Sequence, residues 1–259
     1  MEKHVRRGID FACLGFGLLL VGLAGCGKEG TLGEGLSPEE QFAYTKRMFD
    51  KRDFYKAKMQ FTVLVLNNPG SRIIEDAQFY LAECHFNLKE YLLAAAEYEK
   101  LIKSLPQSAY GDDARYKIGL CYEKLSPGYS LDQEYTLKAI SQYQQFLEEH
   151  PESELRSTVE QNLKDCRNKI AQKEYKTGEL YRKMGYHSSA LISFNAVLEN
   201  FYDTDFADDA LYWKGFCLGK LGNGQEARAV YEMLLAKYPD SEFADPARER
   251  LKGLATAKS

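Results

Sequence analysis

The sequence is poor in residues that carry out catalysis. Among its 259 residues there are four histidines, and no two of them have the spacing of metal ligands. It also has no nucleophile elbow, no glycine-rich phosphate loop after a strand, and no stretch with the alternation of a β-strand. Cys84 and His85 are adjacent, but neighbouring helix positions point about 100° apart, so a core thiol beside a partly exposed ring is the favoured interpretation. We therefore expect no enzyme, no cofactor and no metal.

Positive charge is not in excess either. The chain has 34 lysines and arginines against 38 acidic residues, a formal net charge of -4. Without a basic stripe there is nothing to neutralise phosphates, so the balance gives no reason to expect nucleic-acid binding.

The sequence has no apolar run long enough to span a membrane. Its longest apolar stretch, residues 11–20, follows Lys3, Arg6 and Arg7, and this pattern indicates a signal peptide over residues 1–25. Residues 23–26 match the bacterial lipobox, so Cys26 becomes the lipid-bearing first residue, and the alternative is an ordinary signal peptide with a chance cysteine. Gly27 is not the aspartate that retains many lipoproteins at the inner membrane. We expect a lipid anchor in the outer membrane, a folded part in the periplasm and a flexible tether over residues 26–36.

Four cysteines remain beyond Cys26, and the favoured interpretation is buried thiols rather than disulfides. Cys84, Cys121 and Cys217 occupy the same position of different repeats, and Cys166 lies between them. Equivalent helices of a stacked array have another helix between them, at about 8–10 Å per packing step, whereas a disulfide needs Cα atoms within about 7 Å.

A recurring turn is what the sequence does contain. Residues 106–114 read as a proline after an apolar run, a serine two positions on and then a new helix, and similar starts occur at residues 69–71, 151–153, 202–204 and 239–241. Proline ends a helix and the serine or threonine can cap the next one. Spaced copies of such a turn are typical of a repeat array.

The repeats can be aligned on a small residue of each second helix. It is followed four positions later by a large apolar residue, and the first helices also carry small residues that allow close approach. The second-helix positions are Ala57, Ala94, Ala139, Ala190 and Ala227, separated by 37, 45, 51 and 37 residues. This lengthened form of the 34-residue period predicts an all-α, right-handed superhelix of five tetratricopeptide helix-turn-helix repeats, with repeats 1–3 in residues 37–152 and repeats 4–5 in residues 153–255.

The two longer intervals have separate causes. An insertion around residues 126–130 contains proline and glycine and predicts a loop. Residues 154–184 keep helical spacing without a breaker and predict one long bridging helix between repeats 3 and 4. Ser37, Pro38 and Glu40 form a helix-start signal, and a capping helix is expected from Asp245 to about Leu254.

An aromatic residue recurs at one position of every first helix. We interpret this ladder either as inter-repeat core or as the lining of a groove on the concave side. Its members are Phe42, Phe79, Tyr116, Tyr175 and Tyr212. Phe49 and Phe86, seven residues after the first two members, favour the groove, so the N-terminal groove suits peptides with aromatic or aliphatic anchors. Arg182, Lys183 and Lys220 suit a polar protein contact. Tyr110, Phe206 and Phe243 are interpreted as wedges between repeats.

With its lipobox, repeat junctions and residues 163–204, the sequence resembles the BamD family, tetratricopeptide lipoproteins of the outer-membrane β-barrel assembly machinery. The resemblance implies a non-enzymatic periplasmic scaffold. It implies contact with the POTRA region of a BamA-like subunit through the C-terminal repeats, where Tyr175, Arg182, Lys183, Tyr212 and Lys220 lie. The N-terminal repeats, with Phe42, Phe49, Phe79, Phe86 and Tyr116, would receive unfolded outer-membrane proteins.

Two departures from that family stand in this sequence. The loop of the third repeat is shorter than in proteobacterial members, and Ser193 replaces a basic residue of the fourth repeat's second helix. The alternative is another periplasmic repeat adaptor, such as the Tol-Pal-associated CpoB, which usually has an N-terminal coiled coil and no lipobox.

Overall fold

The computed structural model describes residues 35–256, and this part of the chain contains eleven helices and no strand. The predicted signal peptide, Cys26 and nearly all of the tether lie outside the described residues. The helices are α1 (Pro38–Asp50), α2 (Phe54–Asn67), α3 (Ile74–Asn87), α4 (Tyr91–Ser104), α5 (Gly111–Leu125), α6 (Glu134–Glu149), α7 (Arg156–Lys183), α8 (His187–Asn200), α9 (Ala207–Lys220), α10 (Gly224–Lys237) and α11 (Ala244–Thr256).

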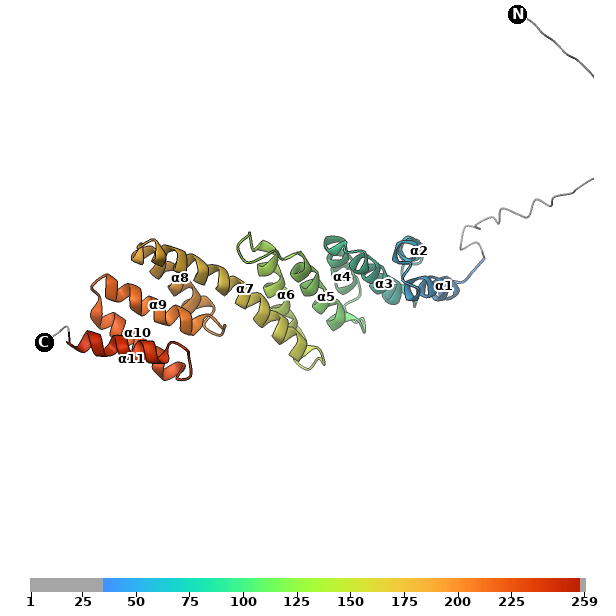
Figure 1. Ribbon diagram of the computed structural model, residues 1–259. Helices are drawn as coiled ribbons and strands as arrows, with labels where there is room; N and C mark the ends of the chain where they lie inside the picture. Colours follow the sequence, from blue (N-terminus) through green and yellow to red (C-terminus); the bar gives the residue numbers. More distant parts are fainter. Residues whose placement is uncertain (1–34, 257–259) are drawn as a thin grey trace, which may run out of the picture. The chain divides into compact units, whose positions relative to one another are not determined.

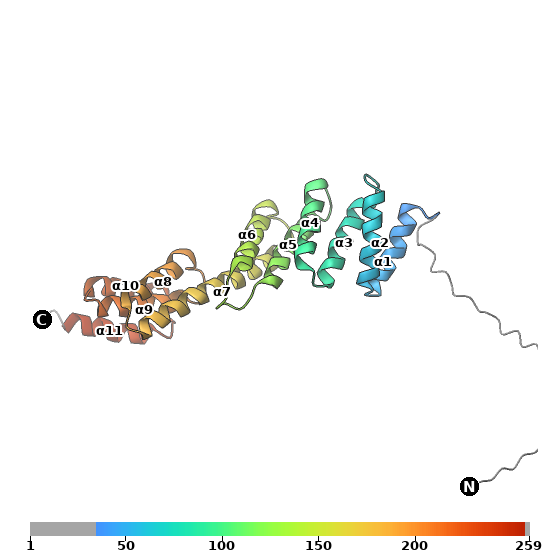
Figure 2. The ribbon, with the colours of Figure 1, turned by 90° about the horizontal axis from the view of Figure 1, so that it is seen from above.

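Each helix packs mainly against the one before it and the one after it. Figures 1 and 2 show the helices following one another in chain order, as antiparallel pairs with α11 at the end. The core is accordingly a row of local clusters rather than one central mass. This is the tetratricopeptide arrangement that the sequence predicts, in which each unit contacts only its neighbours.

The small residues of the first helices allow the close approach expected from the sequence. An added Cβ at Gly119, Gly178 or Gly215 would lie 2.5–2.7 Å from a ring of the paired second helix. Those rings are Tyr143, Phe194 and Tyr231, three of the large residues predicted four positions after the small one, and all are at most 2% exposed. Glycine is thus the residue that lets each ring reach the backbone of the facing helix.

The helix-start prediction at residue 37 is confirmed, but the predicted capping role of the junction serines is wrong. Ser37 and Glu40 form a reciprocal capping box. In contrast, the hydroxyls of Ser108, Ser153 and Ser241 accept a hydrogen bond from the backbone N–H only two residues ahead, and the helix begins one residue after that. These serines stabilise the turn between repeats, because each one lies where two successive backbone turns meet, ending the first and beginning the second.

The bridging helix and the inserted loop are confirmed as predicted. α7 spans 28 residues, about 42 Å at 1.5 Å per residue, and packs against α6 over its first half and α8 over its second half. The loop that follows α5 is held against α7, since Lys169 donates to the Ser126 hydroxyl and Lys173 donates to the Leu131 carbonyl, both at 2.8 Å.

The cysteine prediction is also confirmed. Cys84, Cys121, Cys166 and Cys217 are free and buried. Burial raises the pKa of the first three thiols to about 12 and that of Cys217 to about 11, so they pack as small apolar side chains. Within residues 35–256 no helix is both long enough and apolar enough to cross a membrane.

Candidate protein-binding surface

The structure places the aromatic ladder between helices. Each ladder ring lies beside the large ring of the paired second helix, at centroid distances of 5.8–6.3 Å. The pairs are Phe42 with Phe61, Phe79 with Tyr98, Tyr116 with Tyr143, Tyr175 with Phe194, and Tyr212 with Tyr231. These contacts extend the packing of every repeat by one aromatic pair.

The three predicted wedges each pack against one ring of the ladder, which also contacts the ring of the paired second helix. Tyr110 stacks on Phe79 at 4.2 Å, Phe243 stacks on Tyr212 at 4.6 Å, and Phe206 lies 5.5 Å from Tyr175. As a result Tyr175 and Tyr212 are only 7% exposed. Of the two interpretations of the ladder, inter-repeat core describes these two residues.

Phe49 and Phe86 each contact another aromatic ring and a residue of the next first helix. Phe49 contacts Phe54 at 5.2 Å and Tyr80 at 5.1 Å, both edge to face. Phe86 lies 5.4 Å from Tyr91, and the Lys117 ammonium lies 4.8 Å from the centre of its ring. Both rings are partly buried. We call Phe49, Tyr80 and Phe86 the N-terminal aromatic patch.

In the fourth repeat the position that matches Phe49 holds a cation, Arg182, and two further cations, Lys220 and Arg250, lie near it. The Arg182 guanidinium lies 3.7 Å from the centre of the Trp213 ring. Arg182 occupies the repeat position of Phe49 and Trp213 that of Tyr80, so this contact is equivalent to the contact of Phe49 with Tyr80. Arg182, Lys220 and Arg250 lie 5.8, 5.6 and 5.2 Å from the centre of the Phe216 ring. We call Arg182, Trp213, Phe216, Lys220 and Arg250 the C-terminal cationic cluster.

The structure thus brings together Arg182 and Lys220 of the predicted contact residues, but not Lys183. Lys183 forms an ion pair with Glu179 at 3.0 Å, on a different side of α7, and this hydrogen bond lowers the pKa of Glu179. Sequence reasoning missed Trp213, Phe216 and Arg250. Trp213 could have been found from the register, because it stands where Tyr80 stands in the second repeat.

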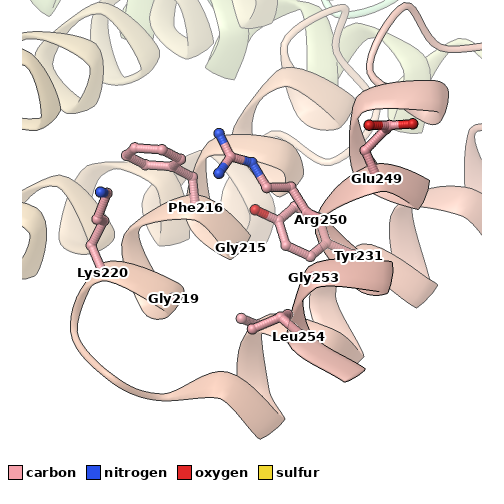
Figure 3. Close-up of a pocket in the computed structure, with 10 residues that line it drawn as sticks. Gly215, Phe216, Gly219, Lys220, Tyr231, Glu249, Arg250, Gly253 and Leu254 are labelled. Carbon is pink, nitrogen blue, oxygen red and sulfur yellow. The ribbon is translucent and has the colours of Figure 1, made fainter. Parts of the chain in front are cut away.

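A cavity of about 330 Å³ opens beside the cluster (Figure 3). Its walls come from α9, α10 and α11, and combine the cations with apolar and glycine surface. The lining residues are Gly215, Phe216, Gly219, Lys220, Ala227, Tyr231, Glu249, Arg250, Gly253 and Leu254. Such a lining accommodates an apolar side chain next to a negative charge.

The described residues contain no group of three or more histidine, cysteine or acidic side chains placed to hold a metal ion. For Cys84 beside His85, the raised thiol pKa of about 12 leaves almost no thiolate at neutral pH, which speaks against a nucleophile there. His85 Nδ1 instead lies 2.6 Å from a Glu90 carboxylate oxygen that also accepts from Lys58.

The helix pairs, their small–large contacts and the lengthened junctions define a tetratricopeptide repeat protein. The model of one family, YfiO, described as an outer membrane lipoprotein, matches residues 35–232. The chain belongs to this family, which is the BamD family that its motifs resemble. It is therefore a repeat protein of an outer-membrane-associated lipoprotein family.

Similar solved structures are also tetratricopeptide proteins. The TPR2AB domain of yeast Sti1, in its pHSP90 complex, is 17% identical, with a TM-score of 0.43 over 85% of this chain and 83% of that one. A repeat protein of Parabacteroides merdae is 16% identical, with a TM-score of 0.37 over 85% and 73%. One from Thermus thermophilus is 15% identical, with a TM-score of 0.36 over 85% and 100%. A comparison with curated protein sequences finds no match.

Proposed function

We propose that the chain is a non-enzymatic, periplasmic scaffold of outer-membrane β-barrel assembly, which binds the POTRA region of a BamA-like subunit and receives unfolded barrel proteins. Family membership supports the setting. The observation that carries the division of labour is the change in chemistry along one register. Phe49 contacts Tyr80 near the N-terminus, whereas Arg182 contacts Trp213 near the C-terminus.

The N-terminal aromatic patch suits the unfolded client. An unfolded β-strand of a barrel protein carries apolar and aromatic side chains at alternate positions. The rings of the patch are partly buried, and their exposed parts offer stacking partners to such side chains. The C-terminal cationic cluster suits a folded partner with a polar, acidic surface.

Co-purification from detergent-solubilised membranes tests the partner. A BamA homologue recovered with the tagged, full-length chain is the expected result. Recovery of Tol-Pal components instead would favour the alternative function, a CpoB-like periplasmic adaptor. Cys26→Ser should release the protein from the membrane fraction, since it removes the predicted site of lipid attachment.

A peptide assay tests the client site. The double variant Phe49→Ala with Phe86→Ala should weaken binding of peptides that end in an aromatic residue, measured by fluorescence anisotropy, because it removes two rings of the patch. Leu66→Ala with Ile192→Ala is the matched control, since these side chains are 69% and 72% exposed and lie on second helices. Unchanged binding by a double variant with native circular dichroism would exclude the patch as the client site.

A further inference from the structure

The three cations of the C-terminal cationic cluster have no anion of their own. No ion pair or hydrogen bond of the described residues involves the side chains of Arg182, Lys220 or Arg250. The Arg182 Nε atom is buried without a hydrogen-bond partner. These side chains are held by aromatic faces rather than by carboxylates, so their charge remains uncompensated.

The arrangement is unusual among the charged groups of this structure. Fifteen lysine or arginine ion pairs form elsewhere between residues 35 and 256, many of them on exposed helix surfaces. In the cluster, three positive groups instead lie 5.2–5.8 Å from the centre of one ring. Because all three positive groups surround the same ring, the cluster carries a local excess of positive charge.

The one acid beside the cavity does not offset this excess of positive charge. Glu249 lines the cavity but pairs with none of the three cations. Figure 3 shows Arg250 extending toward Phe216, with Lys220 beside that ring and Glu249 directed away from both. A negative group supplied from outside would be attracted by all three cations at once.

We propose that the cluster is a binding site for an acidic segment of a partner protein, in which carboxylate side chains meet Arg182, Lys220 and Arg250 while a neighbouring aliphatic side chain enters the cavity. The inference deepens the proposed function by naming the chemistry of the partner's segment. The cavity of about 330 Å³ has the partly exposed Phe216 and Leu254 among its lining residues, which give an aliphatic side chain apolar surface to contact. The side chains of Lys220 and Arg250 are exposed, so their donors are accessible to a carboxylate.

Trp213 allows the site to be observed directly. It is the chain's only tryptophan, and it contacts Arg182 at 3.7 Å and Phe216 at 5.6 Å. A carboxylate bound to Arg182 changes the charge beside the indole, so intrinsic fluorescence reports on the cluster without a label. The purified chain is sufficient for the measurement, so its outcome does not depend on whether a BamA homologue co-purifies.

The experiment titrates the purified protein with a capped peptide that contains two glutamates flanking a leucine. We expect a saturable change in Trp213 fluorescence that weakens at least tenfold when glutamine replaces both glutamates, and weakens with added salt. Lys220→Gln with Arg250→Gln should weaken binding at least tenfold. Both side chains are exposed, so this variant is expected to fold. Lys252→Gln, an exposed charge of α11 that does not line the cavity, should leave binding within twofold.

Several outcomes would overturn the proposal. These are the absence of a saturable change, an equal loss with Lys252→Gln, or unaltered binding when serine replaces the leucine. Vesicles of phosphatidylglycerol provide a further arm, since a response to vesicles without a response to the peptide would assign the cluster to an anionic lipid surface instead.

Discussion

The ring of Tyr110 stacks on the ring of Phe79, with centroids 4.2 Å apart, across the boundary between the second and third repeats. The Tyr110 hydroxyl also donates to an Asp76 carboxylate oxygen at 2.6 Å, so one side chain fixes the junction to α3 by both ring packing and a hydrogen bond. Ile73 and Leu155 occupy the same place at two other boundaries, where burial alone is available.

Replacing Tyr110 should therefore separate the two contributions. Tyr110→Phe keeps the stacked ring and loses a hydrogen bond to a charged group, and should lower the free energy of unfolding by about 1–2 kcal/mol. Tyr110→Ala loses both and should cost about 3 kcal/mol. Urea unfolding followed by circular dichroism measures both. Tyr202→Ala, at a ring that is 64% exposed, is the control and should change stability by less than about 0.5 kcal/mol. Equal effects at Tyr110 and Tyr202 would contradict a structural role for the wedge.

Two glycines of α9 provide a matched pair. A Cβ at Gly215 would lie 2.7 Å from the ring of Tyr231, which is 2% exposed, whereas a Cβ at Gly219 meets nothing within 4 Å. Gly215→Ala should destabilise the protein by about 1–3 kcal/mol through overpacking. Gly219→Ala should be neutral or stabilise it by up to about 1 kcal/mol through helix propensity. Thermal unfolding of both variants checks this, and a stabilising Gly215→Ala would contradict the close approach.

The sequence was sufficient for the helix pairs because each pair repeats a local rule. A small residue, a large residue four positions later and an aromatic on the facing helix are all visible as spacing, and the bridging helix was predicted to within two residues at each end. The junction serines were misassigned, since a serine shortly before a helix is compatible with either an N-cap or a turn that precedes the helix. The structure decides for the turn, because two consecutive backbone turns form at each of these junctions.

The C-terminal cationic cluster could not be predicted in full from the spacing within repeats. Arg182 and Lys220 were singled out from their register, but Arg250 belongs to α11, which has no counterpart in the repeats, so periodicity could not place it against Phe216. The surface depends on how the terminal helix packs, a long-range contact that spacing within a repeat does not encode.

The turns inside the repeats yield a third prediction. Arg52, Lys89, Gly185 and Gly222 occupy equivalent places after α1, α3, α7 and α9, and all have positive φ, at 63°, 62°, 83° and 84°. A residue with a Cβ pays about 1 kcal/mol there and glycine does not. Lys89→Gly should thus raise the free energy of unfolding by up to about 1 kcal/mol, and Gly222→Lys should lower it by about as much. Lys89→Ala keeps a Cβ and should give no gain; a gain with alanine equal to that with glycine would show that the lysine side chain, not the backbone, is responsible.

Asp209 leads to a prediction about pH. Burial first, and then the charges of Asp208 and Glu242, raise the pKa of this carboxyl in the folded state to about 6, although Lys176 opposes the shift. A raised folded pKa means that the stabilising, protonated form is fully present below the unfolded value of about 4 and is lost as the pH rises through about 6. Asp209→Asn should accordingly stabilise the protein at pH 7.5, by no more than about 2 kcal/mol because the group is partly exposed and screened.

The difference in the free energy of unfolding between Asp209→Asn and the wild type should shrink between pH 7 and pH 4, because the wild-type carboxyl becomes protonated in the folded state over this range. Urea midpoints of both proteins across this range measure the difference, in which the other titrating groups largely cancel. Asp240→Asn removes the same charge at an exposed position after α10 and controls for net charge. If the difference between Asp209→Asn and the wild type were constant with pH, the carboxyl would not be titrating within the fold, and the cost of placing Asp209 beside Asp208 and Glu242 would have to come from packing instead.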